Sequence, residues 1–397
     1  MKMTQVYDIV NNVTKEILGD TAVVNEDLSN IVDVGKSILG ATEIDNYVKS
    51  LCDHIGKVIF DDRKYSGNVP SVLMDAWEFG SVLEKITADL PEATENKSWD
   101  LQNGTSYDVN VFYKPTVSAK FYNDRVTFEI PMSFTEKQVK SSFSSAEQLN
   151  GFYSMIYNSI DKSMTIKLDG LIMRTINNMT AQTILKDYAT PTADAIGGGS
   201  TNRVVNVLKL YNDKFGTTLK AEKCLTDTAF IKFASYVIGL YKDRMSKMSE
   251  LFNVGGKPRF TPADDLHLVL LSEFNASVST YLESDTYHNE LVKLPSAEVV
   301  PYWQGSGTSY AFADTSKIDV KTKNESGTLK TVSIGGILGV MFDSNALGVS
   351  NLDRRVTTNY NAKGEFFNNW YKMDAGYFND LNENFVIFLA VDAPAGK

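Results

Sequence analysis

The segment from Phe143 to Asp187 constrains the fold most, because it predicts one very long amphipathic helix. It opens with the capping box Ser144-Ser-Ala-Glu147, whose side chains satisfy the free backbone N–H groups of a helix start. A helix over 144–187 would be roughly 60 Å long, which is too long to lie inside one ordinary domain. Polar residues separate the apolar ones, so we expect a packed stripe and a solvated back. The packing positions are Leu149, Phe152, Ile156, Ile160, Met164, Leu168, Ile172 and Ile176.

Two alternating segments precede this helix. Apolar residues alternate over 117–121 and again over 126–134, and the polar residues 122–125 form a turn between them. This pattern predicts a long β-hairpin that leads into the helix. An isolated two-stranded ribbon is marginally stable in water, so we expect it to lie on the protein's own core or on a neighbouring copy.

The rest of the chain indicates an α+β fold. Residues 1–65 predict short helices broken by glycine, residues 98–133 predict β structure with an early piece at 109–113, and residues 189–200 predict a flexible linker. Further helices are predicted over 202–215, over 227–251 and from an N-cap at Thr261 to about Leu282. Strands are then predicted over 299–303, 317–323, 328–334, 337–342 and 385–391, the second and third of which form a hairpin.

Composition bounds the class of protein. The net charge of −10 argues against a basic nucleic-acid groove, and 43% hydrophobic residues indicate a folded chain. Only Cys52 and Cys224 occur, which we interpret as buried thiols in a reducing compartment. The start has no signal peptide, and no apolar run is long enough to span a membrane.

Catalytic motifs are absent from the sequence. Three histidines occur, and there is no nucleophile elbow, no HExxH and no dinucleotide fingerprint. The Asp264-Asp265-Leu-His267 stretch fits a solvated helix start better than a metal site, the glycines at 197–199 fit a loop, and Gly335-Gly336 fits a tight turn into a strand. We therefore expect no catalytic residue, no cofactor and no metal.

Several stretches resemble the major capsid proteins of tailed bacteriophages. They are Trp77–Lys85, Thr127–Met132, Phe143–Leu149, Ile172–Asn178, Phe342–Gly348 with Asp353–Thr357, and Phe378–Phe385. The resemblance is colinear over residues 70 to 392. It implies the Hong Kong 97 type capsid fold, which encapsulins share.

The family fold implies five segments in this chain. They are an N-terminal arm of short helices (1–75), an extended entry with the E-loop β-hairpin (76–135), the spine helix of the peripheral domain (136–190), a mainly axial domain (191–345) and a return to the sheet with the C-terminal strand (346–397). The resemblance also implies that the E-loop lies over an adjacent subunit. Its contact residues would be Val117, Ala119, Phe121, Tyr122, Asn123, Asp124, Arg125, Val126 and Phe128.

The implied function is that of a structural head protein without enzymatic activity. Copies would assemble into pentamers and hexamers of an icosahedral virion shell that encloses double-stranded DNA without sequence-specific binding. Scaffolding protein and portal are the implied further partners, assembly would occur in the cytoplasm of the bacterial host, and no membrane is involved. The chain would stay uncleaved, with scaffolding supplied separately. Two alternatives remain open at this point: an encapsulin-like compartment shell, and a soluble enzyme with an unrecognised site.

Overall fold

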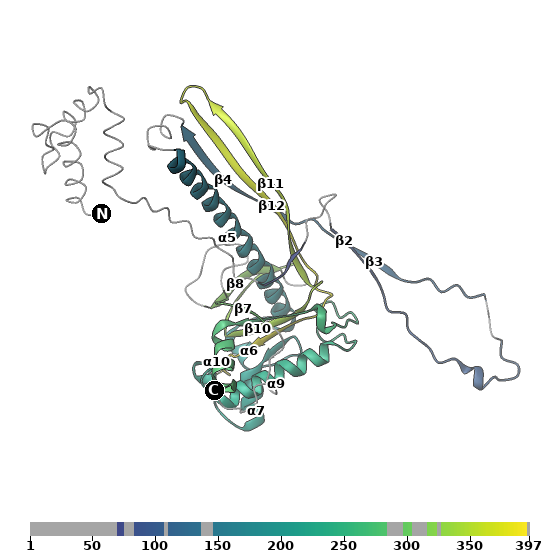
Figure 1. The fold of residues 1–397 in the computed structure, drawn as a ribbon. Helices are drawn as coiled ribbons and strands as arrows, with labels where there is room; N and C mark the ends of the chain where they lie inside the picture. Colours follow the sequence, from purple (N-terminus) through teal and green to yellow (C-terminus); the bar gives the residue numbers. More distant parts are fainter. Residues whose placement is uncertain are drawn as a thin grey trace, which may run out of the picture. The chain divides into compact units, whose positions relative to one another are not determined.

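The computed structural model describes residues 70–74, 83–106, 110–135, 146–283, 297–303, 316–323 and 327–394 (Figure 1). The chain divides into two compact units. Unit 1 holds 1–65, 130–163 and 356–371, and unit 2 holds 66–129, 164–355 and 372–397. The described residues do not include most of the predicted N-terminal arm, which contains Cys52. They also do not include Ser144, the first residue of the predicted capping box.

The predicted spine is one helix, α5 (Ala146–Asp187), as the periodicity indicated (Figure 1). Of the predicted packing positions, Ile156 is half-buried, the side chains of Leu149 and Phe152 lie outside the described ones, and the remaining five are buried. From Leu171 to Leu185 the helix is buried on nearly all sides. The expected solvated back is therefore wrong for this half, as is usual where a helix crosses a core.

Polar residues on the buried half of α5 are accommodated by the helix itself. Thr175 Oγ1 donates to the carbonyl of Leu171 at 2.8 Å, and Thr183 Oγ1 donates to that of Met179 at 2.9 Å. Such bonds to the preceding turn allow a hydroxyl to be buried without a partner from another element. The carbonyl of Thr175 also accepts a hydrogen bond from Asn379 Nδ2 at 3.2 Å.

A five-stranded sheet forms the core of unit 2, in the order β5-β13-β10-β6-β7. β10 (Ile337–Asp343) and β13 (Phe385–Leu389) are apolar runs buried on both faces, as central strands require. β10 pairs antiparallel with β13 and with β6 (Leu266–Leu271). The edge strands β5 (Val204–Asn206) and β7 (Glu298–Val300) pair in parallel with β13 and β6.

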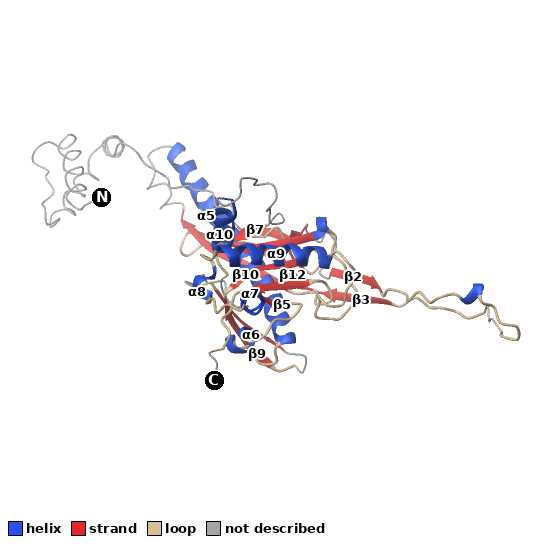
Figure 2. Ribbon diagram, turned by 90° about the horizontal axis from the view of Figure 1, so that it is seen from below, coloured by secondary structure: helices blue, strands red, loops and turns tan. Residues whose placement is uncertain are grey.

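Three helices pack on this sheet or on one another (Figure 2). They are α7 (Val207–Phe215), α9 (Thr228–Met245) and α10 (Ser272–Glu283). α9 begins where the sequence predicted, because Asp227 accepts a hydrogen bond from the amide of Phe230 as an N-cap. α7 ends at Gly216, whose φ of 64° suits glycine.

The hairpin predicted after residue 316 is confirmed. β8 (Lys317–Lys323) pairs antiparallel with β9 (Leu329–Gly335). The predicted tight turn is also present, since Gly336 has φ 71° and a Cβ there would meet the carbonyl of Ala390 at 2.5 Å. Trp303 is fully buried nearby and donates from Nε1 to the carbonyl of Ile337 at 2.9 Å.

The second large sheet has the order β1-β11-β12-β4. Its strands are β1 (Leu73–Met74), β11 (Leu347–Asn361), β12 (Phe366–Asn379) and β4 (Arg125–Thr135). The sequence does not predict β11 and β12 as strands. Both mix Asn and Asp, which are depleted in strands, with β-branched or aromatic residues, which are enriched there, so propensity is ambiguous.

The predicted hairpin of 117–121 with 126–134 is wrong in its pairing. β3 (Val117–Tyr122) pairs antiparallel with β2 (Leu83–Ala88), a strand that the sequence reading missed. β4 pairs with β12 instead. The turn between β3 and β4 therefore changes sheets, and the amide of Tyr377 donates to the carbonyl of Asp124 there at 3.1 Å.

Three other local expectations are corrected. The helix expected to start at Thr261 is a 3₁₀ turn (Ala263–Asp265) followed by β6, with α10 beginning only at Ser272. Thr261 does not cap a helix, because its hydroxyl donates to Asp343 Oδ2 at 2.8 Å. The linker 189–200 contains a short helix, α6 (Ala193–Gly197). Residues 110–113 form no strand, and Lys97–Trp99 and Ala221–Cys224 form single helical turns, η1 and α8.

Candidate subunit-contact surface

The β2–β3 ribbon, defined as Leu83–Ala88 paired with Val117–Tyr122, has two unlike faces. Directly opposed residues lie on the same face of an antiparallel pair. One face carries the pairs Leu83–Tyr122, Lys85–Lys120 and Thr87–Ser118, and the other carries Glu84–Phe121, Ile86–Ala119 and Ala88–Val117. All six residues of the second face are exposed, so we call it the outward face and the first the inward face.

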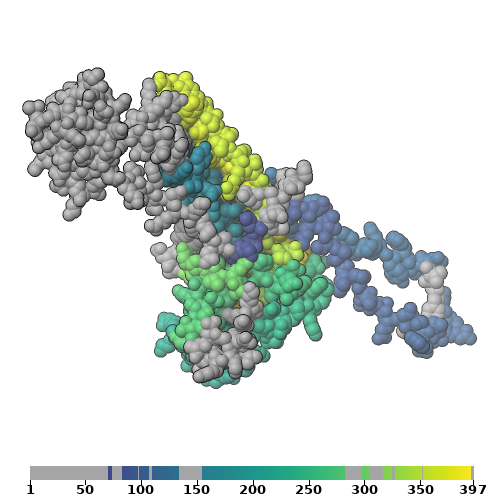
Figure 3. Space-filling view, viewed as in Figure 1, coloured from purple at the N-terminus to yellow at the C-terminus, as the bar shows by residue number. Residues whose placement is uncertain are grey.

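The outward face is apolar except for Glu84, although it is exposed to solvent. Together with the loop 89–116 it holds nine of the twenty large hydrophobic side chains that are exposed on the described residues. The loop is extended and one chain thick over much of its length (Figure 3). Such a concentration marks a surface for another macromolecule. The nine are Ile86, Leu90, Trp99, Leu101, Val111, Phe112, Tyr113, Val117 and Phe121.

The inward face is charged and meets carboxylates of unit 2. Lys85 Nζ lies 2.8 Å from Asp380 Oδ2 and 2.7 Å from Glu383 Oε1. Lys120 Nζ lies 2.8 Å from Asp380 Oδ1, and Arg259 Nε lies 3.3 Å from Glu383 Oε1. The Asp380 side chain is only 2% exposed, so these are not ordinary surface ion pairs. We call these five residues the ribbon-root cluster.

The electrostatics of the ribbon-root cluster favour the ionised carboxylate. Burial opposes ionisation of Asp380, but the hydrogen bonds from Lys120 and Lys85 outweigh it and hold the pKa of this carboxyl below its ordinary 3.8. Burial, together with the nearby charge of Asp380, raises the pKa of Tyr122, which therefore stays protonated. The Tyr122 ring packs against Phe378, with 5.1 Å between ring centroids.

The lowered pKa of Asp380 predicts an acid-dependent loss of stability. Because the unfolded state takes up the proton first, the stabilisation is complete above pH 3.8 and is lost as pH falls through the lower pKa of the folded state. Urea unfolding at about pH 5 and about pH 3 should show a larger loss of free energy of unfolding for wild type than for Asp380→Asn. Equal losses would mean that Asp380 has the same pKa in both states.

The predicted contact residues are divided between several environments. Val117, Ala119 and Phe121 lie on the outward face. Asn123, Asp124 and Arg125 form the exposed turn after β3. Tyr122 lies on the inward face, Val126 is half-buried and Phe128 is buried in β4, so these three face their own chain.

The sequence does not predict other residues of this surface. Ile86 falls in the extended entry before the E-loop, and Trp99, Phe112 and Tyr113 are not among the predicted contacts. Phe112 and Tyr113 fall in the piece predicted as β at 109–113, and because residues 110–113 form no strand these two side chains are left exposed. Asp380 and Glu383 lie in the family-like stretch Phe378–Phe385, but no signal links them to the ribbon, which is far away in sequence.

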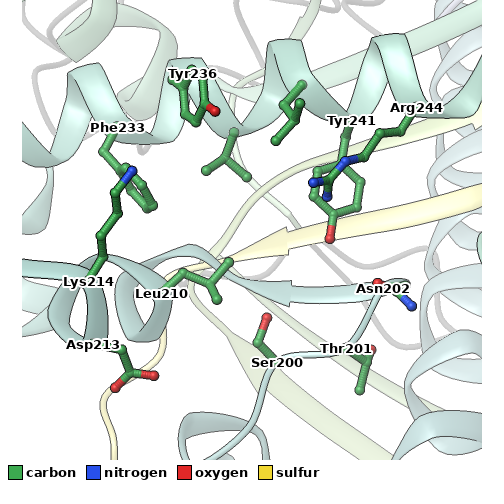
Figure 4. A pocket seen from close by; sticks show the side chains of 12 residues that line it. Ser200, Thr201, Asn202, Leu210, Asp213, Lys214, Phe233, Tyr236, Tyr241 and Arg244 are labelled. Carbon is green, nitrogen blue, oxygen red and sulfur yellow. The ribbon is translucent and has the colours of Figure 1, made fainter.

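A groove between α7 and α9 has a volume of about 690 Å³ (Figure 4). Leu210, Val237 and Leu240 give it an apolar wall. Lys214 Nζ lies over the Phe233 ring at 5.3 Å, and the Arg244 guanidinium lies over Tyr241 at 5.5 Å. Among the lining residues the one carboxylate is Asp213, which pairs with Lys209 at 2.6 Å. This lining is suited to contact and presents no acid–base pair.

The described residues present no other reactive site of these kinds. No group of three or more His, Cys, Asp or Glu side chains there is arranged to hold a metal ion. Cys224 is a buried free thiol, and burial raises its pKa to about 11, so it is a poor nucleophile. None of the described helices combines the length and hydropathy that a membrane span requires.

Solved structures with a similar fold come from phage particles. A chain in the capsid structure of Staphylococcus phage Andhra is 9% identical with a TM-score of 0.54, over 85% of this chain and 87% of that one. A chain in the structure of the head fiber and inner core protein gp22 of bacteriophage P68 is 9% identical with a TM-score of 0.50, over 84% and 87%. At this identity the likeness concerns the fold, and it confirms the α+β capsid fold of Hong Kong 97 type.

Sequence comparison identifies the family. No curated protein matches the chain. A family model described as Phi29-like phage major capsid protein matches residues 10–389, which is most of the chain. This match supports a phage capsid shell and not the encapsulin-like alternative. The chain belongs to the Phi29-like phage major capsid proteins and is a structural protein of the phage capsid shell.

Proposed function

We propose that copies of this chain assemble into the pentamers and hexamers of a closed icosahedral head through the β2–β3 ribbon and the loop 89–116. In this assembly the outward face and the loop lie on a neighbouring copy. The chain acts as a structural element and not as an enzyme. The shell encloses double-stranded DNA without reading its sequence, and the protein's acidic charge of −10 is consistent with a container that does not bind phosphate along its length.

One observation carries this proposal: the ribbon turns apolar side chains to solvent and its lysines towards its own subunit. A strand pair that served only its own subunit would turn Ile86 and Phe121 inward and its lysines to solvent. Here Ile86 and Phe121 are each 64% exposed, while Lys85 and Lys120 point to their own subunit. Burying the two apolar side chains against another copy contributes on the order of 2 to 4 kcal/mol at each contact. That gain recurs at every contact of a shell.

Scaffolding protein and portal are proposed as further partners, with assembly in the cytoplasm of the bacterial host. The family supports these proposals, because a closed shell of one repeated chain needs a start site and an entry for its genome. The described residues include no element that we assign to either partner.

The proposal is tested by removing the apolar character of the outward face. We expect the double variant Ile86→Ser, Phe121→Ser to keep its free energy of unfolding within about 0.5 kcal/mol per site, because exposed side chains contribute little to the fold. We also expect the fraction that sediments as shells to fall at least about tenfold, given the contact energy lost at each interface. Sedimentation and circular dichroism melting on the same preparations measure both.

Leu329→Ser is the matched control. Leu329 is 63% exposed on β9, so this variant loses one apolar side chain of similar fractional exposure at a place outside the ribbon. This variant should assemble as wild type does. Normal shell formation by the ribbon double variant would overturn the proposal, and unfolding of that variant would place the ribbon in the core of its own subunit.

A further inference from the structure

The pairing within the β2–β3 ribbon does little to fix the position of the ribbon relative to the rest of unit 2. It is a separate two-stranded sheet that pairs with no other described strand. Lys85 and Lys120 are directly opposed in its register, and like charges in such a pair repel. A two-stranded ribbon with this pair at its centre would not hold one orientation by itself.

The carboxylates of the turn after β12 remove this conflict. Asp380 accepts from both lysines, one at each oxygen, and so lies between the two like charges. Glu383 accepts from Lys85 and from Arg259, and the carbonyl of Asn345 accepts from Lys85 at 3.2 Å. Charge-assisted hydrogen bonds of this kind are short and directional.

We propose that the ribbon-root cluster is a positioning device, in which Asp380 and Glu383 hold Lys85 and Lys120 so that the ribbon leaves the subunit in one direction. This inference rests on the proposed function, because the direction matters only if the outward face meets a neighbouring copy. Lys85 and Lys120 are then positioning residues: they do not touch the neighbour, and they determine where Ile86 and Phe121 are presented.

Further contacts near the ribbon-root cluster also help to fix the position of the ribbon. On the inward face the hydroxyls of Thr87 and Ser118 lie 3.0 Å apart, two register pairs beyond the lysines. Lys257 Nζ lies 3.2 Å from Asp89 at the end of β2. The turn that carries the carboxylates is fixed independently, since the amide of Asp380 donates to the carbonyl of Ala346 at 2.7 Å. The ribbon is thus held at its root, and the loop beyond it has its apolar side chains exposed.

The inference is tested on the full-length protein with Lys85→Gln, Lys120→Gln, which leaves the 380–383 turn and the outward face intact. In the unassembled subunit we expect the amides of β2 and β3 to exchange with deuterium at least about tenfold faster, with α9 and β13 unchanged. We expect shell formation to slow by a similar factor. The conservative variant Lys85→Arg, Lys120→Arg keeps both charges and should restore both readouts.

A second pair of variants addresses the other side of the cluster. Asp380→Asn should give the same faster exchange in β2 and β3, whereas Asp213→Asn, which breaks an exposed pair with Lys209, should not. Unchanged exchange in the Lys→Gln variant, or faster exchange with wild-type assembly, would overturn the inference. Wild-type assembly of Ile86→Ser, Phe121→Ser would instead overturn the proposed function, so the two failures are distinguishable.

Discussion

Replacing residues 91–115 with a short Gly-Ser turn that joins β2 to β3 is expected to abolish shell formation while leaving a folded subunit. The described side chains of this segment are exposed, so the subunit core loses almost nothing. The proposed contact with a neighbouring copy, in contrast, loses large apolar side chains such as Trp99, which is fully exposed in the single subunit. Sedimentation should show no closed particles, and circular dichroism should show a cooperative melt close to that of wild type.

A control separates loop length from loop chemistry. A loop of full length in which Leu90, Trp99, Leu101, Phe112 and Tyr113 are all serine should fail to assemble as completely as the shortened one. Assembly by the serine loop would mean that the backbone of the loop makes the contact. Assembly by the shortened chain would show that the loop is not part of the intersubunit surface.

Ile176→Lys is expected to give the largest loss of subunit stability, more than about 4 kcal/mol. Ile176 is fully buried, in the part of α5 where nearly every face is covered, so a lysine there has no route to water. Lys167→Ala, at an exposed position of the same helix, should change the free energy of unfolding by less than about 0.5 kcal/mol. Urea unfolding of the unassembled subunit measures both, and similar losses would contradict the assignment of the buried face.

Local signals in the sequence were sufficient for some elements. The period of apolar residues predicted α5 almost to its ends, and it predicted the start of α9 at Asp227, although α9 ends at Met245 and not at 251. The β8–β9 hairpin followed from alternation around a glycine turn. In each case the residues that decide the structure lie within a few turns or one short loop of each other, so propensity and packing agree.

Other elements depended on distant partners. The alternation on both sides of Tyr122 favoured a hairpin, but β3 pairs with β2 across the long loop 89–116. The sequence Thr261-Pro-Ala-Asp264 favours a helix start, yet the apolar run Leu266–Leu271 that follows forms strand β6, which pairs with β10. A short apolar run is ambiguous between helix and strand until its neighbours are known. The lysine partners on 380–383 were beyond any local signal.

The place of β13 in the sheet has a consequence for the order in which the chain becomes competent to assemble. β13 follows every other described strand along the chain, yet it lies between β5 and β10, so the core sheet of unit 2 cannot close before Phe385–Leu389 has been synthesised. Asp380 and Glu383 immediately precede it. The β2–β3 ribbon is synthesised much earlier and lacks Asp380 and Glu383 until then. On the proposed assembly, the apolar loop 89–116 is therefore exposed before the ribbon-root cluster can fix the direction of the ribbon.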